Sequence, residues 1–402
     1  MFLKPLNNNV PIHYFCGHSL GLQPEITRLK INAELEKWAL YGVEGHFESP
    51  DPWFSYHHTV KKGLAELCGA KESEVNANGS LTSNIHNLFA SFYNPTKEKY
   101  KILTEDIGFS SDNFAMQTQV QFHGYQIEDA IVFLEHNENY CFDTDYIIEQ
   151  IEKHKNELSI IWLSVVNFLS GQVLNLELIS NCAAKYNIKV GVDLAHAIGN
   201  IPLKLHTWGV DFAVWCSYKY LNAGPGATGG YFVHEKNFPQ SKIEEQLATH
   251  NSQLTTILGG WWGHKEETRF QTGISFDPVN NADAWLHSNA NVLSLSALRA
   301  SLEIFLSEDI HLLSAKSKKQ TIYAFDKFRQ SNKIKILTPE KQAGNMISIQ
   351  VLNQDKSLVT KLKEQNILVD WREPGIMRFS FCPLYNEENE WKHFIDLLNE
   401  ML

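Results

Sequence analysis

Short apolar runs alternate with amphipathic stretches over the first two thirds of the chain. Helical patterns follow some of these runs, from Asp112 onward and at 177–186. The runs themselves are typical of buried strands and lie at 100–104, 160–166, 188–193, 212–217 and 230–233. Strands that alternate with helices at this spacing predict an α/β domain built around a largely parallel sheet.

The pattern changes in the last third of the chain. From about Ala290 apolar residues recur at spacings of three and four, as on one face of a long helix. Alternating segments at 346–351 and 377–381 predict half-buried strands, with a helix at 358–365 between them and a closing helix from about Asn386. We therefore expect a smaller α+β domain after the large one.

Composition and charge narrow the class of protein. The 402 residues carry 35 Lys+Arg and 46 Asp+Glu, for a formal net charge of −11. An acidic surface repels phosphate backbones, so we expect no nucleic-acid partner. No apolar run approaches the ~18 residues of a membrane helix, and the first residues lack a basic segment followed by an apolar run. We therefore expect neither a membrane partner nor secretion.

Cysteine and histidine usage adds two expectations. The six cysteines are scattered and form no CxxC pair, which is typical of a cytoplasmic protein with reduced, buried thiols. The 17 histidines form no HExxH motif and no zinc spacing with cysteine, and the adjacent His57 and His58 would point in different directions on a helix. We predict no metal site.

Asp193 and Lys219 each follow a predicted strand of the sheet. Ligands of open α/β sheets bind beyond the carboxyl ends of the strands, so these two side chains could face one ligand. A buried lysine readily forms a Schiff base, and an aspartate can keep a pyridine nitrogen protonated; pyridoxal phosphate (PLP) requires both. Taken alone, Asp193 could cap a helix, Lys219 could lie at the surface and His196 could be a core histidine.

Two glycine-containing segments are candidates for phosphate binding. Residues 224–229 contain GxGxxG, but a strand-like segment follows directly where a dinucleotide fingerprint requires a helix, so a tight turn near Lys219 fits better. The segment 79–84 precedes an apolar helical run, and the free N–H groups of such a helix start can bind phosphate with the help of the Thr82 hydroxyl. A simple serine or threonine cap explains this segment equally well.

The two strand-end segments carry a family resemblance. Residues 193–200 (Asp-Leu-Ala-His-Ala-Ile-Gly-Asn) and 217–226 (Ser-Tyr-Lys-Tyr-Leu-Asn-Ala-Gly-Pro-Gly) resemble kynureninase, and further matches lie at 14–24, 81–86, 109–112, 260–264, 372–378 and 383–386. The resemblance implies the type I PLP fold of aspartate aminotransferase. It implies an N-terminal segment (1–48) that contributes to the small domain, and a large PLP-binding α/β domain (49–288) with a mainly parallel seven-stranded sheet. A small C-terminal α+β domain (289–402) would follow.

The resemblance also implies a role for each matched position. Lys219 would carry the cofactor as a Schiff base, Asp193 would pair with its pyridine nitrogen, and His196 would support Asp193. The other cofactor-binding positions would be Leu81, Thr82 and Tyr218 around the phosphate, Phe109 against the ring, Asp112 and Ser164 nearby, and Trp261 and Asn289 from the neighbouring subunit of a homodimer. Arg378 would clamp the substrate α-carboxylate, with Asn289 also at the substrate.

The reaction implied is hydrolysis of the Cβ–Cγ bond of L-kynurenine to anthranilate and L-alanine, within tryptophan degradation and NAD-related metabolism. Lys219, Tyr218 and Asp193 would be the catalytic residues, with Tyr218 as proton donor. His18 stands where the family usually has asparagine, and Val43 where some members have a histidine near the aryl group, which leaves the preference for 3-hydroxykynurenine open. A cysteine desulfurase that uses Cys382, or a silent PLP-fold binding protein, would be the alternatives.

Overall fold

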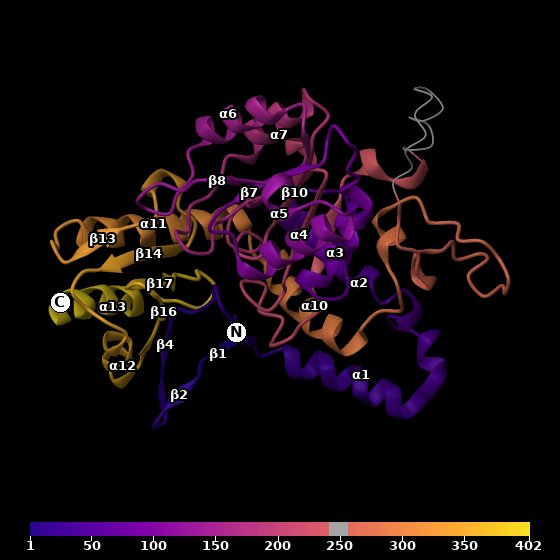
Figure 1. The fold of residues 1–402 in the computed structure, drawn as a ribbon. Coiled ribbons are helices and arrows are strands. Elements are labelled where there is room, and N and C mark those ends of the chain that lie inside the picture. Colours follow the sequence, from indigo (N-terminus) through magenta and orange to yellow (C-terminus); the bar gives the residue numbers. More distant parts are fainter. Residues whose placement is uncertain (241–255) are drawn as a thin grey trace.

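The computed structural model describes residues 1–240 and 256–402. A seven-stranded sheet with the order β6-β12-β11-β10-β9-β7-β8 forms its centre (Figure 1). The strands are β6 (Val75–Ala77), β7 (Lys101–Glu105), β8 (Ile131–Leu134), β9 (Leu158–Ser164), β10 (Lys189–Asp193), β11 (Phe212–Trp215) and β12 (Gly230–Val233). β12 is antiparallel to both of its neighbours, β11 and β6, and the other neighbouring pairs are parallel. The mainly parallel seven-stranded sheet is therefore confirmed.

Helices cover both faces of this sheet, which explains the continuous apolar runs of its strands. Alternate residues of each strand join different cores: Ile161 and Leu163 of β9 belong to one, and Ile160 and Trp162 to the other. The first core is closed by α2 (His58–Cys68), α6 (Thr144–His154), α7 (Leu176–Ala184), α8 (Leu205–Trp208) and α10 (Val292–Ser307). The second is closed by α3 (Leu81–Phe92), α4 (Ser110–Phe122) and α5 (Ile127–Ala130).

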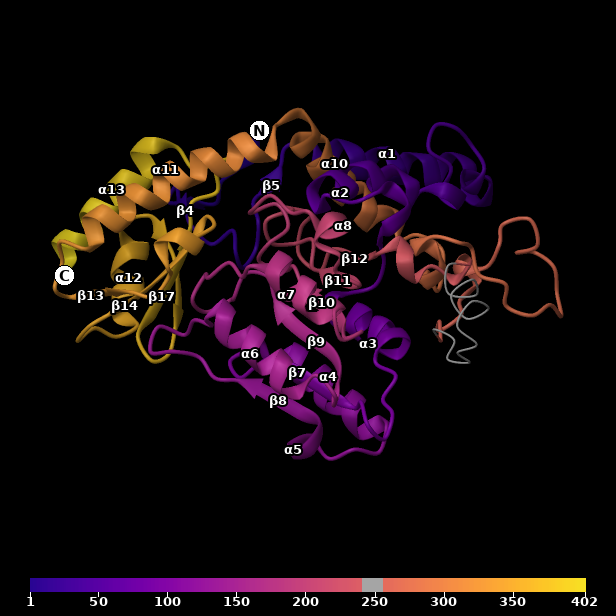
Figure 2. The same ribbon diagram turned by 90° about the horizontal axis from the view of Figure 1, so that it is seen from above.

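A second, four-stranded antiparallel sheet lies in the C-terminal part, with the order β13-β14-β17-β16 (Figure 2). Its strands are β13 (Ile334–Ile336), β14 (Met346–Val351), β16 (Asp370–Arg372) and β17 (Ile376–Ser380), and its helices are α11 (Ile310–Phe328), α12 (Ser357–Glu364) and α13 (Glu388–Met401). Phenylalanines from α11, β17 and α13 form a separate core. The small α+β unit predicted from the sequence is thus present.

The N-terminal segment contacts both units. β4 (His13–Tyr14) pairs in parallel with β15 (Ile367–Leu368), and α1 (Thr27–Tyr41) packs along α10 (Figure 2). The other short strands are β1 (Phe2–Leu3), which pairs with β5 (Gln23–Pro24), and β2 (Leu6–Asn7), which pairs with β3 (Val10–Pro11). Domain boundaries at 48 and 288 stay a prediction.

Two expectations about the whole chain can be compared with the described residues. All six cysteines are buried free thiols, as the sequence predicts. Among the helices of the described residues, none has both the length and the apolar character needed to cross a lipid bilayer.

Candidate active site

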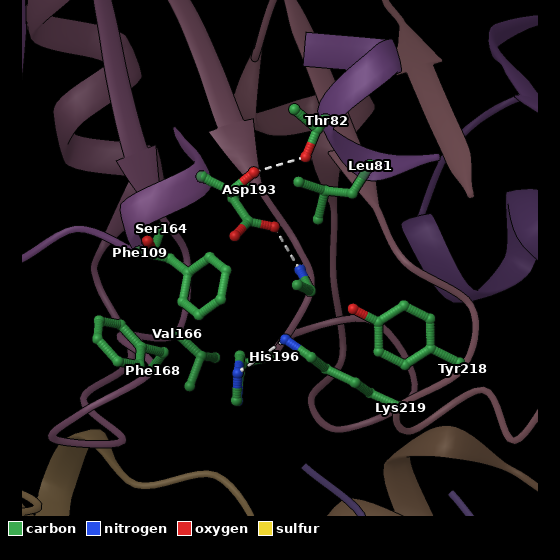
Figure 3. A pocket seen from close by; sticks show the side chains of 12 residues that line it. Leu81, Thr82, Phe109, Ser164, Val166, Phe168, Asp193, His196, Tyr218 and Lys219 are labelled. Carbon is green, nitrogen blue, oxygen red and sulfur yellow. Dashed lines mark hydrogen bonds between the residues drawn. The ribbon is translucent and has the colours of Figure 1, made fainter. Parts of the chain in front are cut away.

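Three neighbouring parallel strands, β9, β10 and β11, end at one pocket (Figure 3). Its empty volume is about 590 Å³, including space that is open to solvent. The lining residues are Leu81, Thr82, Phe109, Ser111, Ser164, Val166, Phe168, Asp193, Ala195, His196, Tyr218 and Lys219. Eight of the predicted site residues therefore converge at the carboxyl edge of the sheet, where ligands of such folds bind.

The N-terminus of α3 forms one wall of the pocket. Ser80 caps this helix by accepting a hydrogen bond from the Ser83 backbone N–H. Leu81 and Thr82 line the pocket, and the Thr82 hydroxyl lies 2.6 Å from that of Ser111. A cap and an anion site are therefore compatible here, since the free N–H groups and hydroxyls at a helix start can cradle a phosphate.

The glycine-rich segment 224–229 serves close packing against this wall. A side-chain carbon added at Gly229 would lie 3.0 Å from the backbone nitrogen of Leu81 and 2.9 Å from the carbonyl oxygen of Trp215. β12 follows directly, as the sequence predicts. Glycine thus lets two backbone segments meet beside the α3 N-terminus, which agrees with a tight turn and not with a dinucleotide fingerprint.

Asp193 is the buried acid of the pocket and comes directly from the end of β10. Its carboxylate accepts a 2.6 Å hydrogen bond from the backbone N–H of Ala195. Burial raises the pKa of Asp193, whereas the positive charge of Lys219, the Ala195 N–H and a hydrogen bond from Asp112 all favour its charged form. An anion held in this way can pair with a protonated ring nitrogen.

Asp112 and Glu105 are further buried acids near Asp193. Burial and the charge of Asp193 raise the pKa of Asp112 well above its ordinary value, so Asp112 keeps its proton and can donate to Asp193. Burial likewise raises the pKa of Glu105 to about 8. Glu105 accepts a 3.0 Å hydrogen bond from Ser164, which lines the pocket. The negative charge of this cluster is therefore concentrated on Asp193.

Lys219 reaches the pocket from the loop after β11. Its Nζ lies 3.1 Å from Nε2 of His196 and 5.7 Å from the centre of the Phe109 ring (Figure 3). Burial and the positive charge of Lys219 hold the pKa of His196 well below its ordinary value, so the ring is neutral and can accept a hydrogen bond from the lysine. Burial also raises the pKa of Tyr218, so its hydroxyl keeps a proton to donate.

The other predicted site residues lie outside this pocket wall. Arg378 is buried in β17, and its Nη1 donates a 2.5 Å hydrogen bond to the carbonyl oxygen of Phe168, a lining residue. Trp261 is 49% exposed and lies in a short turn. Its indole N–H donates a hydrogen bond to the backbone carbonyl of Arg269. Asn289 is exposed ahead of α10. One chain therefore does not bring Trp261 or Asn289 to its own pocket.

Several residues of the site were not predicted from the sequence. Val166, Phe168 and Ala195 follow the ends of β9 and β10, and Glu105 ends β7. The rule that pointed to Asp193, that residues at the carboxyl ends of parallel strands face the ligand, would have indicated all four. Ser111 lies at the start of α4, inside the matched segment 109–112.

Two clusters of possible metal ligands occur among the described residues. Glu74, His206 and His234 form one, and the Glu74 carboxylate there is already hydrogen-bonded. In the other, His57 and His58 both approach Asp283, at 3.7 and 3.8 Å, so the expectation that they point apart is wrong. His57 precedes the first turn of α2, which turns its ring toward its neighbour. Lys61 already pairs with Asp283 at 2.5 Å. The absence of a resident metal stays a prediction.

The residues of the pocket fit pyridoxal phosphate. They provide a lysine for covalent attachment, a buried carboxylate for a pyridine nitrogen, an aromatic ring and a helix N-terminus for a phosphate. His196 Nδ1 and Ser217 Oγ are buried without hydrogen-bond partners in the described structure. The fold and the site thus define a type I PLP-dependent enzyme, and residues 52–245 match the aminotransferase class-V family.

The particular family follows from the comparison with known proteins. Residues 313–398 match the kynureninase C-terminal domain. The kynureninase of Myxococcus xanthus is 41% identical over 96% of this chain and 89% of its own length. That of Flavobacterium psychrophilum is 39% identical over 99% of this chain and 93% of its own length. The chain belongs to the kynureninase family of PLP-dependent hydrolases.

Solved structures confirm the fold at greater evolutionary distance. An apo cysteine desulfurase from Thermococcus onnurineus superposes with a TM-score of 0.77 at 16% identity, over 97% of this chain and 94% of its own. A cystine C–S lyase with its product cysteine persulfide gives a TM-score of 0.77 at 17% identity, over 97% of both chains. At this identity the likeness shows the fold alone.

Proposed function

We propose that this chain hydrolyses the Cβ–Cγ bond of L-kynurenine with one water, giving anthranilate and L-alanine. The observation that carries the proposal is the convergence of Lys219 and the buried Asp193 in one pocket of a kynureninase-family chain. PLP, when bound, would supply a covalently attached electron sink. The roles of the individual side chains are part of this proposal.

Lys219 would hold the cofactor covalently and, as a free amine, would remove the proton from Cα of the substrate. Neutral His196, 3.1 Å away, can accept a hydrogen bond from the lysine and so helps to hold its amine in the pocket. Asp193 would pair with the pyridine nitrogen of the cofactor; burial raises its pKa, and Lys219, Ala195 and Asp112 oppose that rise by favouring its charged form. The cofactor, held by Asp193 at its ring nitrogen, would stabilise the negative charge that forms at Cα.

Tyr218 acts after the Cβ–Cγ bond breaks, as the proton donor to Cβ. Water adds to the carbonyl carbon of the substrate, the bond from that carbon to Cβ breaks, and Cβ must then take up a proton. Burial keeps the Tyr218 hydroxyl protonated, and the residue lines the same pocket as Lys219. A protonated phenol within the pocket is suited to this donation. Arg378, behind Phe168, binds the α-carboxylate of the substrate.

The cysteine desulfurase alternative is disfavoured by the state of Cys382. A desulfurase needs an accessible thiolate that can attack the substrate sulfur. Cys382 is 5% exposed, and burial raises the pKa of its thiol to about 12. A silent binding protein is disfavoured because Lys219, Asp193 and Arg378 are all present.

The active form is proposed to be a homodimer with shared sites. Trp261 and Asn289 lie away from the pocket of their own chain and are exposed. Large apolar side chains are also exposed on and after α1, where a monomer would leave them in water; they are Leu29, Leu35, Trp38, Leu40, Tyr41, Val43 and Phe47. A second copy that covers this region would bury them and could bring its Trp261 and Asn289 to the pocket.

The cellular setting is proposed from the same chemistry. Six free thiols suit the reducing cytoplasm. Release of anthranilate and alanine from kynurenine belongs to tryptophan degradation, and the 3-hydroxy substrate would connect it to NAD-related metabolism. The departure at Val43 is exposed on the turn after α1, and His18 is buried beside Ser380, so neither lines the pocket of its own chain.

A fluorescence assay for anthranilate release tests the proposal. The purified holoenzyme is incubated with L-kynurenine, and in parallel with 3-hydroxykynurenine, while an absorption scan with and without borohydride checks for a Schiff base. We expect anthranilate formation and a cofactor band that disappears on reduction. A reducible band without turnover of either substrate would reject kynurenine hydrolysis, and sulfide release from cysteine would then favour the desulfurase alternative.

A further inference from the structure

Arg378 is held by a carboxylate of the neighbouring strand. Asp370 and Arg378 are directly paired positions of β16 and β17. Oδ2 of Asp370 accepts a 2.8 Å hydrogen bond from Nε of Arg378 and a second one from Nη2. The third contact is the bond from Nη1 to the carbonyl of Phe168. The guanidinium is therefore fixed on two sides by the protein itself.

These contacts leave a defined part of Arg378 for a ligand. A guanidinium has five N–H groups. Three of them are used by Asp370 and Phe168, so one N–H remains on each terminal nitrogen. Two N–H groups on adjacent nitrogens match the two oxygens of a carboxylate. Asp370 thus selects which edge of the arginine stays free.

His18 lies behind Asp370 in a buried chain of hydrogen bonds. Its Nδ1 is 2.9 Å from the hydroxyl of Ser380, which is 3.0 Å from that of Tyr220. Burial raises the pKa of Tyr220 and lowers the pKa of His18 to about 4, so the phenol keeps its proton and the imidazole is neutral.

One arrangement of protons satisfies this chain. Tyr220 donates to Ser380, Ser380 donates to Nδ1 of His18, and the remaining proton of His18 sits on Nε2. That atom is buried without a hydrogen-bond partner in the described structure and lies 3.6 Å from Oδ2 of Asp370. A small movement of either side chain would close this distance to a hydrogen bond.

The side chains around Asp370 carry one more positive charge than negative charge. Arg372 also approaches Oδ2 of Asp370, with its Nε at 3.3 Å. Two guanidinium groups thus face one carboxylate, and neutral His18 adds no charge. The excess of one positive charge can be neutralised by the α-carboxylate of an amino acid.

We propose that Asp370 and His18 are positioning residues that orient Arg378 for the α-carboxylate of the substrate. The inference rests on the proposed function in that it takes the ligand to be an α-amino acid. Neither residue touches the ligand; both act through the guanidinium. Replacing them should therefore weaken ligands that carry the carboxylate and spare those that lack it.

The probes are L-alanine and ethylamine, which differ only by the α-carboxylate. Their dissociation constants for the holoenzyme are measured from the change in cofactor absorbance, without turnover. In Asp370→Asn we expect L-alanine to bind on the order of tenfold more weakly, and ethylamine to bind within about twofold of wild type. KM for kynurenine should rise by a similar factor, while kcat stays within about threefold. Glu340→Gln, which removes a carboxylate from the exposed Arg329, is the matched control and should change neither constant.

His18 supplies a second and milder test. His18→Phe keeps an aromatic ring but loses the N–H toward Asp370, and it should weaken L-alanine selectively. His18→Gln restores a donor and should recover at least part of that loss. Parallel weakening of both probes, or unchanged L-alanine binding in Asp370→Asn and His18→Phe, would overturn the inference. Because the probes need no turnover, failure of kynurenine hydrolysis in the wild type would count against the proposed function alone.

Discussion

Nζ of Lys219 lies 3.1 Å from Nε2 of His196, and the two residues come from loops that follow neighbouring strands, β11 and β10. The sheet therefore fixes their distance, since parallel strands deliver their carboxyl ends to one edge. Burial and the charge of Lys219 keep His196 neutral. The neutral ring can therefore accept a hydrogen bond from the amine and fix its position in the pocket, where a Schiff-base lysine must be held.

Lys219→Ala is expected to abolish turnover and to remove the borohydride-sensitive cofactor band. The substitution removes both the covalent anchor and the base for Cα, and among the residues lining the pocket Lys219 is the one lysine. Absorption spectra and the anthranilate assay measure the two losses. Lys335→Ala, which removes a half-buried lysine of β13 that lies outside the pocket, should leave both unchanged. A Lys219→Ala protein with activity near wild type would contradict the assignment.

Asp193→Asn should fold and retain some cofactor but lower kcat strongly. An amide cannot neutralise a pyridinium charge, so the loss falls on the transition state rather than on ligand binding. Steady-state kinetics on the reconstituted variant measure it, with Asp277→Asn at an exposed ion pair as the control. A kcat within about threefold of wild type, roughly 0.6 kcal/mol, would mean that the cofactor ring is oriented differently.

The regular parts of the fold could be predicted from the sequence because both faces of the central sheet are buried. The apolar runs at 160–166 and 230–233 correspond to β9 and β12, to within two residues. β6 and β8 were not predicted from the pattern: β6 has only three residues with the polar Asn76 at its centre, and β8 lies at the edge of the sheet with Phe133 exposed. The antiparallel direction of β12 has no local signal either, because direction is set by the connection and not by side chains.

Apart from the family resemblance and the helix start at Thr82, the site could be predicted where one residue's chemistry and its place at a strand end agree. Asp193 and Lys219 satisfied both conditions. Asp370 lies 177 positions beyond Asp193 in the sequence, and it becomes relevant only because β16 pairs with β17 and sets it opposite Arg378. The pairing of His57 and His58 with Asp283 similarly depends on a contact across more than 200 positions. Such contacts carry no local pattern in the sequence.

Glu105 should make the stability of the cofactor-free protein depend on pH. Its pKa rises from an ordinary 4.5 to about 8 because of burial. Between these values the folded chain holds a proton that the unfolded chain releases. The contribution of Glu105 to the free energy of unfolding is therefore complete below about pH 4.5 and is lost as the pH rises to about 8. Glu105→Gln cannot ionise and should escape the loss, on the order of a few kcal/mol at most.

Thermal unfolding of wild type and Glu105→Gln from pH 5 to 8.5 measures this contribution. The difference in unfolding temperature between the variant and the wild type should shift in favour of the variant as the pH rises. Asp112 and Asp193 also have raised pKa values and remain in the variant, so both proteins keep a pH dependence and Glu105 accounts for the difference between them. Parallel curves for the two proteins would show that Glu105 is already charged at pH 5 in the folded state.

Cys382→Ser is expected to keep kynurenine turnover within a few fold of wild type. The thiol is buried beside Tyr385, and burial raises its pKa to about 12, so the native protein holds no thiolate there near neutral pH. Serine keeps the size and a donor, which limits the structural cost. The anthranilate assay measures the variant, and iodoacetamide should leave Cys382 unmodified until the protein unfolds. Loss of activity with rapid alkylation of native Cys382 would revive the desulfurase alternative.

Mixed dimers test whether Trp261 serves the site of the other subunit. Trp261 is half exposed and lies outside the pocket of its own chain. Trp261→Ala should therefore inactivate the site of the other subunit, whereas Lys219→Ala inactivates the site of its own subunit. Each variant alone should be inactive. In a mixed dimer one site combines an intact Lys219 with an intact partner Trp261, and the other site carries both defects. Random exchange makes half the dimers mixed, so activity should return to about a quarter of wild type. The control mixes Lys219→Ala with Asp193→Asn. Both residues line the pocket of one chain, so every site of a mixed dimer carries one defect, and activity should not recover. Recovery with Trp261→Ala but not with this control places Trp261 across the interface, whereas no recovery after proven exchange would return it to its own subunit.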